Sequence, residues 1–109
     1  MALVDNLIKK GVLKNPKLIS AFRAVDRKDF VPAGIKNLAY LDEPLPIGDG
    51  QTISQPWTVA FMLELLSPKP NDNIMEIGYG SGWQTALLAA VGANVYAIEL
   101  VPELCQWGK

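Results

Sequence analysis

The stretch NIMEIGYGSGWQTALLAAVGANVYAI, residues 73–98, decides the fold. Its first five residues are typical of a short strand, and a glycine-rich turn follows at residues 78–82. Residues 83–91 are rich in alanine and leucine and predict a helix that Gly92 ends, and residues 95–98 predict a second strand. This order of strand, turn, helix and strand is typical of the opening unit of a parallel nucleotide-binding sheet, so we expect an α/β fold.

The glycine-rich turn is well placed to hold a ligand. It would open a helix, where backbone N–H groups point outward, and glycine lets the backbone approach a ligand closely. Glu99 ends the following strand, where a carboxylate can accept hydrogen bonds from ribose hydroxyls. The turn reads G-x-G-x-G, and Trp83 stands where the dinucleotide pattern G-x-G-x-x-G needs glycine. Because Glu76 also suits the cationic amino-acid end of S-adenosylmethionine, the sequence favours that cofactor over a dinucleotide; a purely structural turn is the alternative.

Two short helices are expected near the N-terminus. Apolar residues recur at helical spacing before Gly11, and Asn15 followed by Pro16 suits the start of a second helix. The basic doublets Lys9-Lys10 and Arg27-Lys28 are expected to be solvated helix ends.

Residues 30–56 differ in character, because proline recurs and disfavours helix at each preceding residue. The apolar residues among the prolines predict an ordered loop that covers a site, without clear secondary structure. Ser54 is expected to cap the next helix, which ends before Ser67, while Trp57 is expected in the core, with pocket lining as the alternative.

Composition excludes several functions. The 109 residues are half hydrophobic and carry a net charge of −1, so no basic face is available for non-specific binding to nucleic acid. Apolar runs are too short for a membrane span. There is no histidine, and the lone Cys105 forms no internal disulfide, so we expect no metal site, no thiol catalysis and a cytoplasmic location.

Three motifs resemble those of the protein-L-isoaspartate O-methyltransferase family. They are YLDEPLPIGDGQTISQP at residues 40–56, MEIGYGSGWQTA at residues 75–86 and RKDFVP at residues 27–32. The resemblance implies N-terminal helices followed by the first β-α-β unit of a class I, Rossmann-like methyltransferase. It further implies methyl transfer from S-adenosylmethionine to the carboxylate of L-isoaspartyl residues in damaged proteins, a step in protein repair.

The resemblance also implies roles for individual residues. Ser54 matches the active-site serine and would orient the substrate carboxylate, although a pure capping role is the alternative. Tyr79 stands where the family usually has threonine, and Trp83 replaces a tyrosine. The residues expected to bind the cofactor are Thr52, Ile53, Glu76, Gly78, Tyr79, Gly80, Ser81, Gly82 and Glu99.

Length is where the chain departs from the resemblance, because family members are much longer. We expect residues 1–55 to form a helical segment with the substrate loop, and residues 56–109 to begin the cofactor-binding domain. The exposed edge and face of a two-stranded parallel sheet would need cover from a second copy or from the missing C-terminal half. A truncated, non-catalytic module that keeps partial cofactor binding or an oligomerisation surface is therefore the alternative function.

Overall fold

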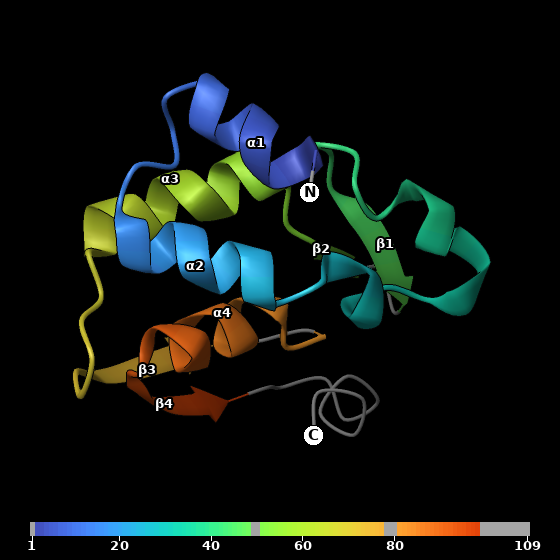
Figure 1. Ribbon diagram of the computed structural model, residues 1–109. Coiled ribbons are helices and arrows are strands. Elements are labelled where there is room, and N and C mark those ends of the chain that lie inside the picture. Colours follow the sequence, from blue (N-terminus) through green and yellow to red (C-terminus); the bar gives the residue numbers. More distant parts are fainter. Residues whose placement is uncertain (1, 49–50, 78–80, 99–109) are drawn as a thin grey trace.

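The computed structural model describes residues 2–48, 51–77 and 81–98. It contains four α-helices, two 3₁₀ helices and four strands within these ranges (Figure 1). In chain order they are α1 (Ala2–Lys9), α2 (Pro16–Ala24), η1 (Arg27–Phe30), η2 (Ala33–Leu38), β1 (Leu45–Gly48), β2 (Gln51–Ile53), α3 (Pro56–Leu66), β3 (Asn73–Ile77), α4 (Trp83–Val91) and β4 (Asn94–Ile98).

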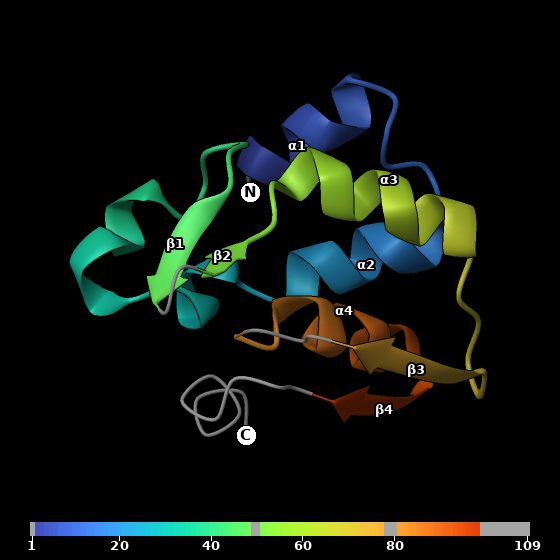
Figure 2. The same ribbon diagram turned by 180° about the vertical axis from the view of Figure 1, so that it is seen from behind.

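The helices form a stack above one sheet. Figure 1 shows α1, α3, α2 and α4 in that order above β3 and β4, with the β1–β2 hairpin to one side, and Figure 2 shows the same order from behind. The inward side chains are mainly leucine and valine and share one core, which Leu7, Leu18, Leu63 and Leu87 fill at 0–1% exposure. The two predicted N-terminal helices are confirmed, with the Asn15 side chain accepting a hydrogen bond from the Lys17 N–H.

The predicted β-α-β unit is confirmed. Strands β3 and β4 pair in parallel, with Met75 opposite Tyr96, and α4 packs on one face of the pair. Gly92 ends α4 at φ +103°, a left-handed conformation that glycine adopts without strain. The fold is therefore α/β, and the alanine-rich helix α4 supplies the crossover connection that two parallel strands require.

The opposite face of this sheet is apolar and exposed. Met75, Ile77 and Tyr96 are 66%, 71% and 62% exposed, and they lie on the side away from α4. Parallel sheets are normally covered on both faces, and the described residues cover only one.

The segment between η2 and α3 contains a hairpin that the sequence did not predict. Strands β1 and β2 pair antiparallel, with Leu45 opposite Ile53 and a register shift between Pro46 and Gly48. A proline preceded by an extended residue is compatible with an edge strand as well as with a loop. Which of the two forms depends on pairing with another strand, and the local sequence does not reveal that pairing. The expectation of order is confirmed, and the expectation of a loop without secondary structure is wrong.

The predicted cap of α3 is also wrong. The N-cap position is occupied by Gln55 rather than Ser54, and its side chain makes no capping hydrogen bond. Instead, the backbone N–H of Trp57 donates a hydrogen bond to the Asp42 carboxylate at 2.8 Å. A distant carboxylate thus satisfies the first turn, which leaves the Ser54 side chain exposed and free of a capping role.

None of the helices in the described part of the chain combines the length and apolarity needed to span a membrane.

Candidate functional site

The glycine-rich turn joins β3 to α4. Glu76, near the end of β3, is 9% exposed and accepts a hydrogen bond from the hydroxyl of Thr85 on α4. Ser81 is buried, and Gly82 adopts φ +95° immediately before the helix, where a side chain would be strained. A buried carboxylate thus lies beside the N-terminus of α4. The other predicted cofactor residues, Gly78, Tyr79, Gly80 and Glu99, lie outside the described residues.

The second group of predicted residues lies at the end of the hairpin. Thr52 and Ser54 are exposed, whereas Ile53 between them is 5% exposed and packs in the core. Alternation along a strand explains this pattern, because successive side chains point to opposite faces. Ile53 therefore anchors the segment through its side chain, and the two flanking hydroxyls are the groups that a ligand can reach.

Arg27 holds this segment from inside the protein. Its Nη1 donates to the carbonyl oxygens of Ala39 and Leu41, each at 3.0 Å. Its Nη2 donates to the carbonyl oxygens of Glu43 at 2.8 Å and Ser54 at 3.0 Å. The side chain is 1% exposed, so the expectation of a solvated helix end is wrong for this residue. Only a guanidinium offers enough donors in one plane to serve four carbonyls.

Burial lowers the pKa of Arg27 to about 10, and the charge of nearby Asp42 acts in the opposite direction. Arg27 is therefore still charged at neutral pH. Backbone carbonyls of the proline-rich segment that have no partner in a β-sheet accept hydrogen bonds from the guanidinium. These hydrogen bonds stabilise the buried positive charge of Arg27. The missed signal was an arginine upstream of a proline-rich segment whose turns leave backbone carbonyls in need of donors.

The same guanidinium connects the two groups of predicted site residues. Its central carbon lies 5.3 Å from the centre of the Trp83 ring, a cation–π distance. Trp83 is 3% exposed, begins α4 directly after Gly82, and meets the ring of Phe22 edge-on at 5.8 Å. Arg27 thus contacts the Ser54 backbone on one side and the first residue of α4 on the other.

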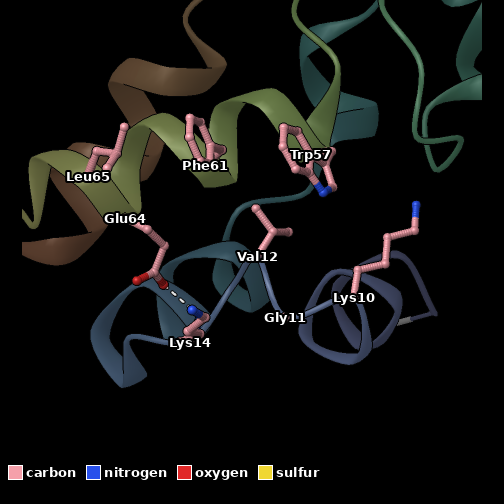
Figure 3. Close-up of a pocket in the computed structure, with 8 residues that line it drawn as sticks. All are labelled: Lys10, Gly11, Val12, Lys14, Trp57, Phe61, Glu64 and Leu65. Carbon is pink, nitrogen blue, oxygen red and sulfur yellow. Dashed lines mark hydrogen bonds between the residues drawn. The ribbon is translucent and has the colours of Figure 1, made fainter.

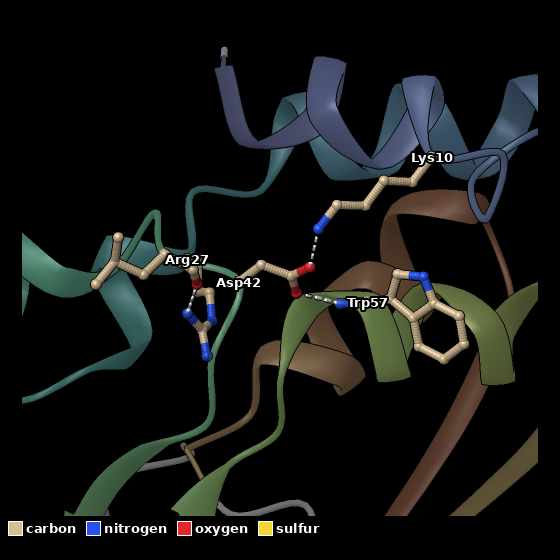
Figure 4. A network of polar contacts seen from close by, with 5 residues as sticks. Lys10, Arg27, Asp42 and Trp57 are labelled. Carbon is tan, nitrogen blue, oxygen red and sulfur yellow. Dashed lines mark hydrogen bonds and ion pairs between the residues drawn. The ribbon is translucent and has the colours of Figure 1, made fainter.

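Asp42 fixes the outer part of the segment. Its carboxylate accepts from Lys10 Nζ at 2.7 Å and from the Trp57 N–H, and Figure 4 shows it between these two groups, with Arg27 near the same loop. Burial alone raises the pKa of Asp42, but the hydrogen bond from Lys10, with the Trp57 N–H and the Lys10 charge, brings it below its usual value. The loop, α1 and the start of α3 are therefore tied together by one carboxylate.

A groove of about 440 Å³ lies between α3 and the α1–α2 connection, and Lys10 and Trp57, which contact Asp42, are among the residues that line it (Figure 3). Trp57 and Phe61 stack along it at 5.3 Å between ring centres. Trp57 is 37% exposed, so its predicted place in the core is wrong; it lines this groove, and the alternative that it lines the cofactor and substrate pocket stays a prediction. The carboxylate of Glu64 in the groove already accepts the N–H groups of Lys14 and Asn15. Residues predicted for the site do not line this groove.

No group of three or more metal-ligating side chains occurs within residues 2–48, 51–77 and 81–98. The arrangement offers exposed hydroxyls, a buried carboxylate and a helix N-terminus, which can bind and orient a ligand.

Comparison with known proteins identifies the family. The family model for protein-L-isoaspartate(D-aspartate) O-methyltransferase matches residues 1–109. The protein-L-isoaspartate O-methyltransferase of Methanospirillum hungatei is 53% identical over 100 residues, which are 92% of this chain and 46% of the relative. That of Aeropyrum pernix is 42% identical over 112 residues, covering 100% of this chain and 43% of the relative. The chain therefore spans about half the length of the curated relatives it matches.

Solved structures agree with this assignment. A protein-L-isoaspartate O-methyltransferase from Plasmodium falciparum, crystallised with S-adenosyl-L-homocysteine, is similar to this chain with a TM-score of 0.87 and 27% identity. The match covers 98% of this chain and 51% of that one. A second solved protein-L-isoaspartate O-methyltransferase gives a TM-score of 0.82 at 26% identity, over 98% of this chain and 36% of its own. The family predicted from the three motifs is confirmed: the chain belongs to the protein-L-isoaspartate(D-aspartate) O-methyltransferase family.

Proposed function

We propose that this chain carries the methyl-donor site and the substrate serine of a protein-L-isoaspartate O-methyltransferase. The observation that carries the proposal is the contact of Arg27 with both the Ser54 backbone and Trp83, which links the two predicted halves of the site. In this proposal, residues 1–55 supply the substrate side and residues 56–109 begin a Rossmann-like domain that binds the donor.

The described residues fit S-adenosylmethionine, the donor that the family uses. The Plasmodium falciparum relative binds S-adenosyl-L-homocysteine, the product that this donor leaves behind. Here, buried Glu76 supplies negative charge for the cationic amino-acid end, and Gly82 at φ +95° keeps the start of α4 open to close approach. Thr52, Gly78, Tyr79, Gly80, Ser81 and Glu99 complete the proposed donor site, and the buried side chain of Ile53 anchors Thr52 beside it.

The donor, when bound, supplies an activated methyl group on a sulfonium centre. The acceptor carboxylate is anionic at neutral pH, so the protein needs no strong general base. In our proposal, the Ser54 hydroxyl donates a hydrogen bond that orients this carboxylate, and buried Ile53 holds the serine in place. Positioning of the two reactants supplies most of the rate enhancement.

We further propose that the exposed sheet face is covered in the active protein. Met75, Ile77 and Tyr96 form an apolar surface that either a second half of the family fold or a second copy of the chain would bury. The proposed location is the cytoplasm, a reducing compartment in which the lone Cys105 would stay reduced.

The test joins residues 1–109 to the remaining half of the Methanospirillum hungatei relative and measures methyl transfer. An isoaspartyl peptide is the acceptor, and the same peptide with normal aspartate is the matched control. Calorimetric titration of the 109-residue chain with S-adenosyl-L-homocysteine measures donor-site binding separately.

We expect transfer to the isoaspartyl peptide only, with loss of transfer in Ser54→Ala. A folded chimera that transfers no methyl group, under conditions where the intact relative is active, would overturn the proposal. Binding by the chain without transfer by the chimera would instead support the non-catalytic module.

A further inference from the structure

Arg27 makes contacts that exceed what a packing role requires. One guanidinium accounts for four backbone hydrogen bonds, to three alternate residues of the loop and to Ser54, at 2.8–3.0 Å. Three of these carbonyls lie in the loop before β1 and the fourth lies just after β2, so the guanidinium ties together the two outer ends of the β1–β2 hairpin. The backbone of Ser54 is thereby fixed relative to the loop at residues 39–43.

The other face of the guanidinium rests on Trp83. This ring is buried at the first residue of α4, and Phe22 supports it edge-on. A displacement of Arg27 would therefore change the position of Ser54 relative to Gly82, the residue that precedes Trp83.

The arrangement is costly for a role limited to stability. Nε of Arg27 and Nε1 of Trp83 are buried without hydrogen-bond partners among the described residues. Buried donors of this kind reduce stability, and such local departures from optimal packing are concentrated at functional sites.

We propose that Arg27 is a positioning residue, which sets the separation between the Ser54 hydroxyl and the donor site at the start of α4. This inference rests on the proposed function, because it concerns the geometry of that same site. Arg27 acts through the Ser54 carbonyl and through Trp83, and it contacts neither reactant.

The first test compares Arg27→Lys with Arg23→Lys in the chimera that carries residues 1–109. Lysine keeps the positive charge but cannot serve four carbonyls in one plane. Arg23 lies four residues earlier, near the end of α2, and forms an exposed pair with Asp5, so its variant is a matched control. We expect Arg27→Lys to lower kcat by roughly 10- to 100-fold, with the KM for S-adenosylmethionine changed by less than about threefold. The control should retain both constants.

A second readout is independent of activity. Hydrogen exchange of the 109-residue chain should show the amides of residues 39–43 and 51–54 exchanging at least about tenfold faster in Arg27→Lys, with α3 unchanged. Both variants are compared at a temperature where circular dichroism shows them fully folded.

The outcomes separate the inference from the proposed function. Wild-type kcat and wild-type loop exchange in a folded Arg27→Lys variant would overturn the positioning role while leaving the proposed function intact. Equal losses in kcat and in donor affinity, with faster exchange throughout the chain, would also overturn it, because they indicate a purely structural role. Absence of transfer in the unsubstituted chimera would count against the proposed function, and the exchange experiment would then decide alone whether Arg27 holds Ser54 in place.

Discussion

The substrate loop and the parallel sheet are stabilised in opposite ways. The loop at residues 39–43 is irregular, yet a buried guanidinium ties it to Ser54, and a shared carboxylate ties it to Lys10 and to the start of α3. The β3–β4 sheet has regular geometry, yet one of its faces exposes Met75, Ile77 and Tyr96. Regular secondary structure therefore does not indicate which part of this chain is packed on all sides. The Ser54 backbone is fixed by contacts within the described residues, whereas the β3–β4 sheet, on which we propose that the donor binds, has one face open.

The largest expected effect comes from removing the buried charge. Arg27→Met should lower the free energy of unfolding by about 3 to 5 kcal/mol, because four buried carbonyls lose their donors. Urea denaturation followed by circular dichroism measures the change. Arg23→Met removes an exposed arginine and should cost less than about 1 kcal/mol. Equal effects of the two substitutions would show that the loop is not held from inside.

The proposed binding of the methyl donor is tested by removing the negative charge of Glu76 on β3. Glu76→Gln should weaken binding of S-adenosyl-L-homocysteine by roughly 10-fold, which corresponds to about 1.4 kcal/mol, because an amide offers no negative charge to the cationic end. Calorimetric titration measures the affinity, and Glu43→Gln, on an exposed residue of the loop, is the control. Unchanged affinity in Glu76→Gln would contradict the assigned role.

Asp42 should make the stability of the protein depend on pH. Its pKa in the folded protein is below its usual value, so it contributes stability above the unfolded pKa of about 4, which is lost as the pH falls through the folded pKa. Asp42→Asn should cost about 1 kcal/mol at pH 7 because the Lys10 pair and the cap of α3 are weakened. The difference from the unsubstituted chain should shrink below about pH 4. A difference that persists at pH 3 would mean that the carboxylate charge is unimportant.

The smallest effect on stability is expected on the open sheet face. Ile77→Lys should change the free energy of unfolding of the 109-residue chain by less than about 0.5 kcal/mol, because the side chain is 71% exposed. The same substitution should prevent association with a second copy or with a separately added second half, as measured by sedimentation. A large loss of stability in the isolated monomer would show that this face is already covered.

Much of the fold followed from local sequence. Gly92, the alanine-rich helix and the flanking apolar strands predicted the β-α-β unit because each element is specified by its own residues. Asn15 and Pro16 likewise specified the start of α2. These predictions are confirmed because they depend on contacts within a few residues.

The errors concern contacts between distant segments. Ser54 was predicted to cap α3, but the cap comes from Asp42, which reaches it through the tertiary fold. Arg27 was predicted to be solvated, but the carbonyls that bury it lie 12 to 27 residues away. Of the candidate site, the predicted ligand-binding residues stay a prediction, and the sequence missed Arg27, which holds the Ser54 backbone from inside the protein.

The most direct test of a single shared site is hydrogen exchange of the 109-residue chain with and without S-adenosyl-L-homocysteine. We predict slower exchange at residues 51–55 and at residues 81–85 together, and no change along α3 at residues 61–66. Protection of only one of these two segments, or protection centred on the groove beside α3, would contradict the claim that Ser54 and the start of α4 belong to one site.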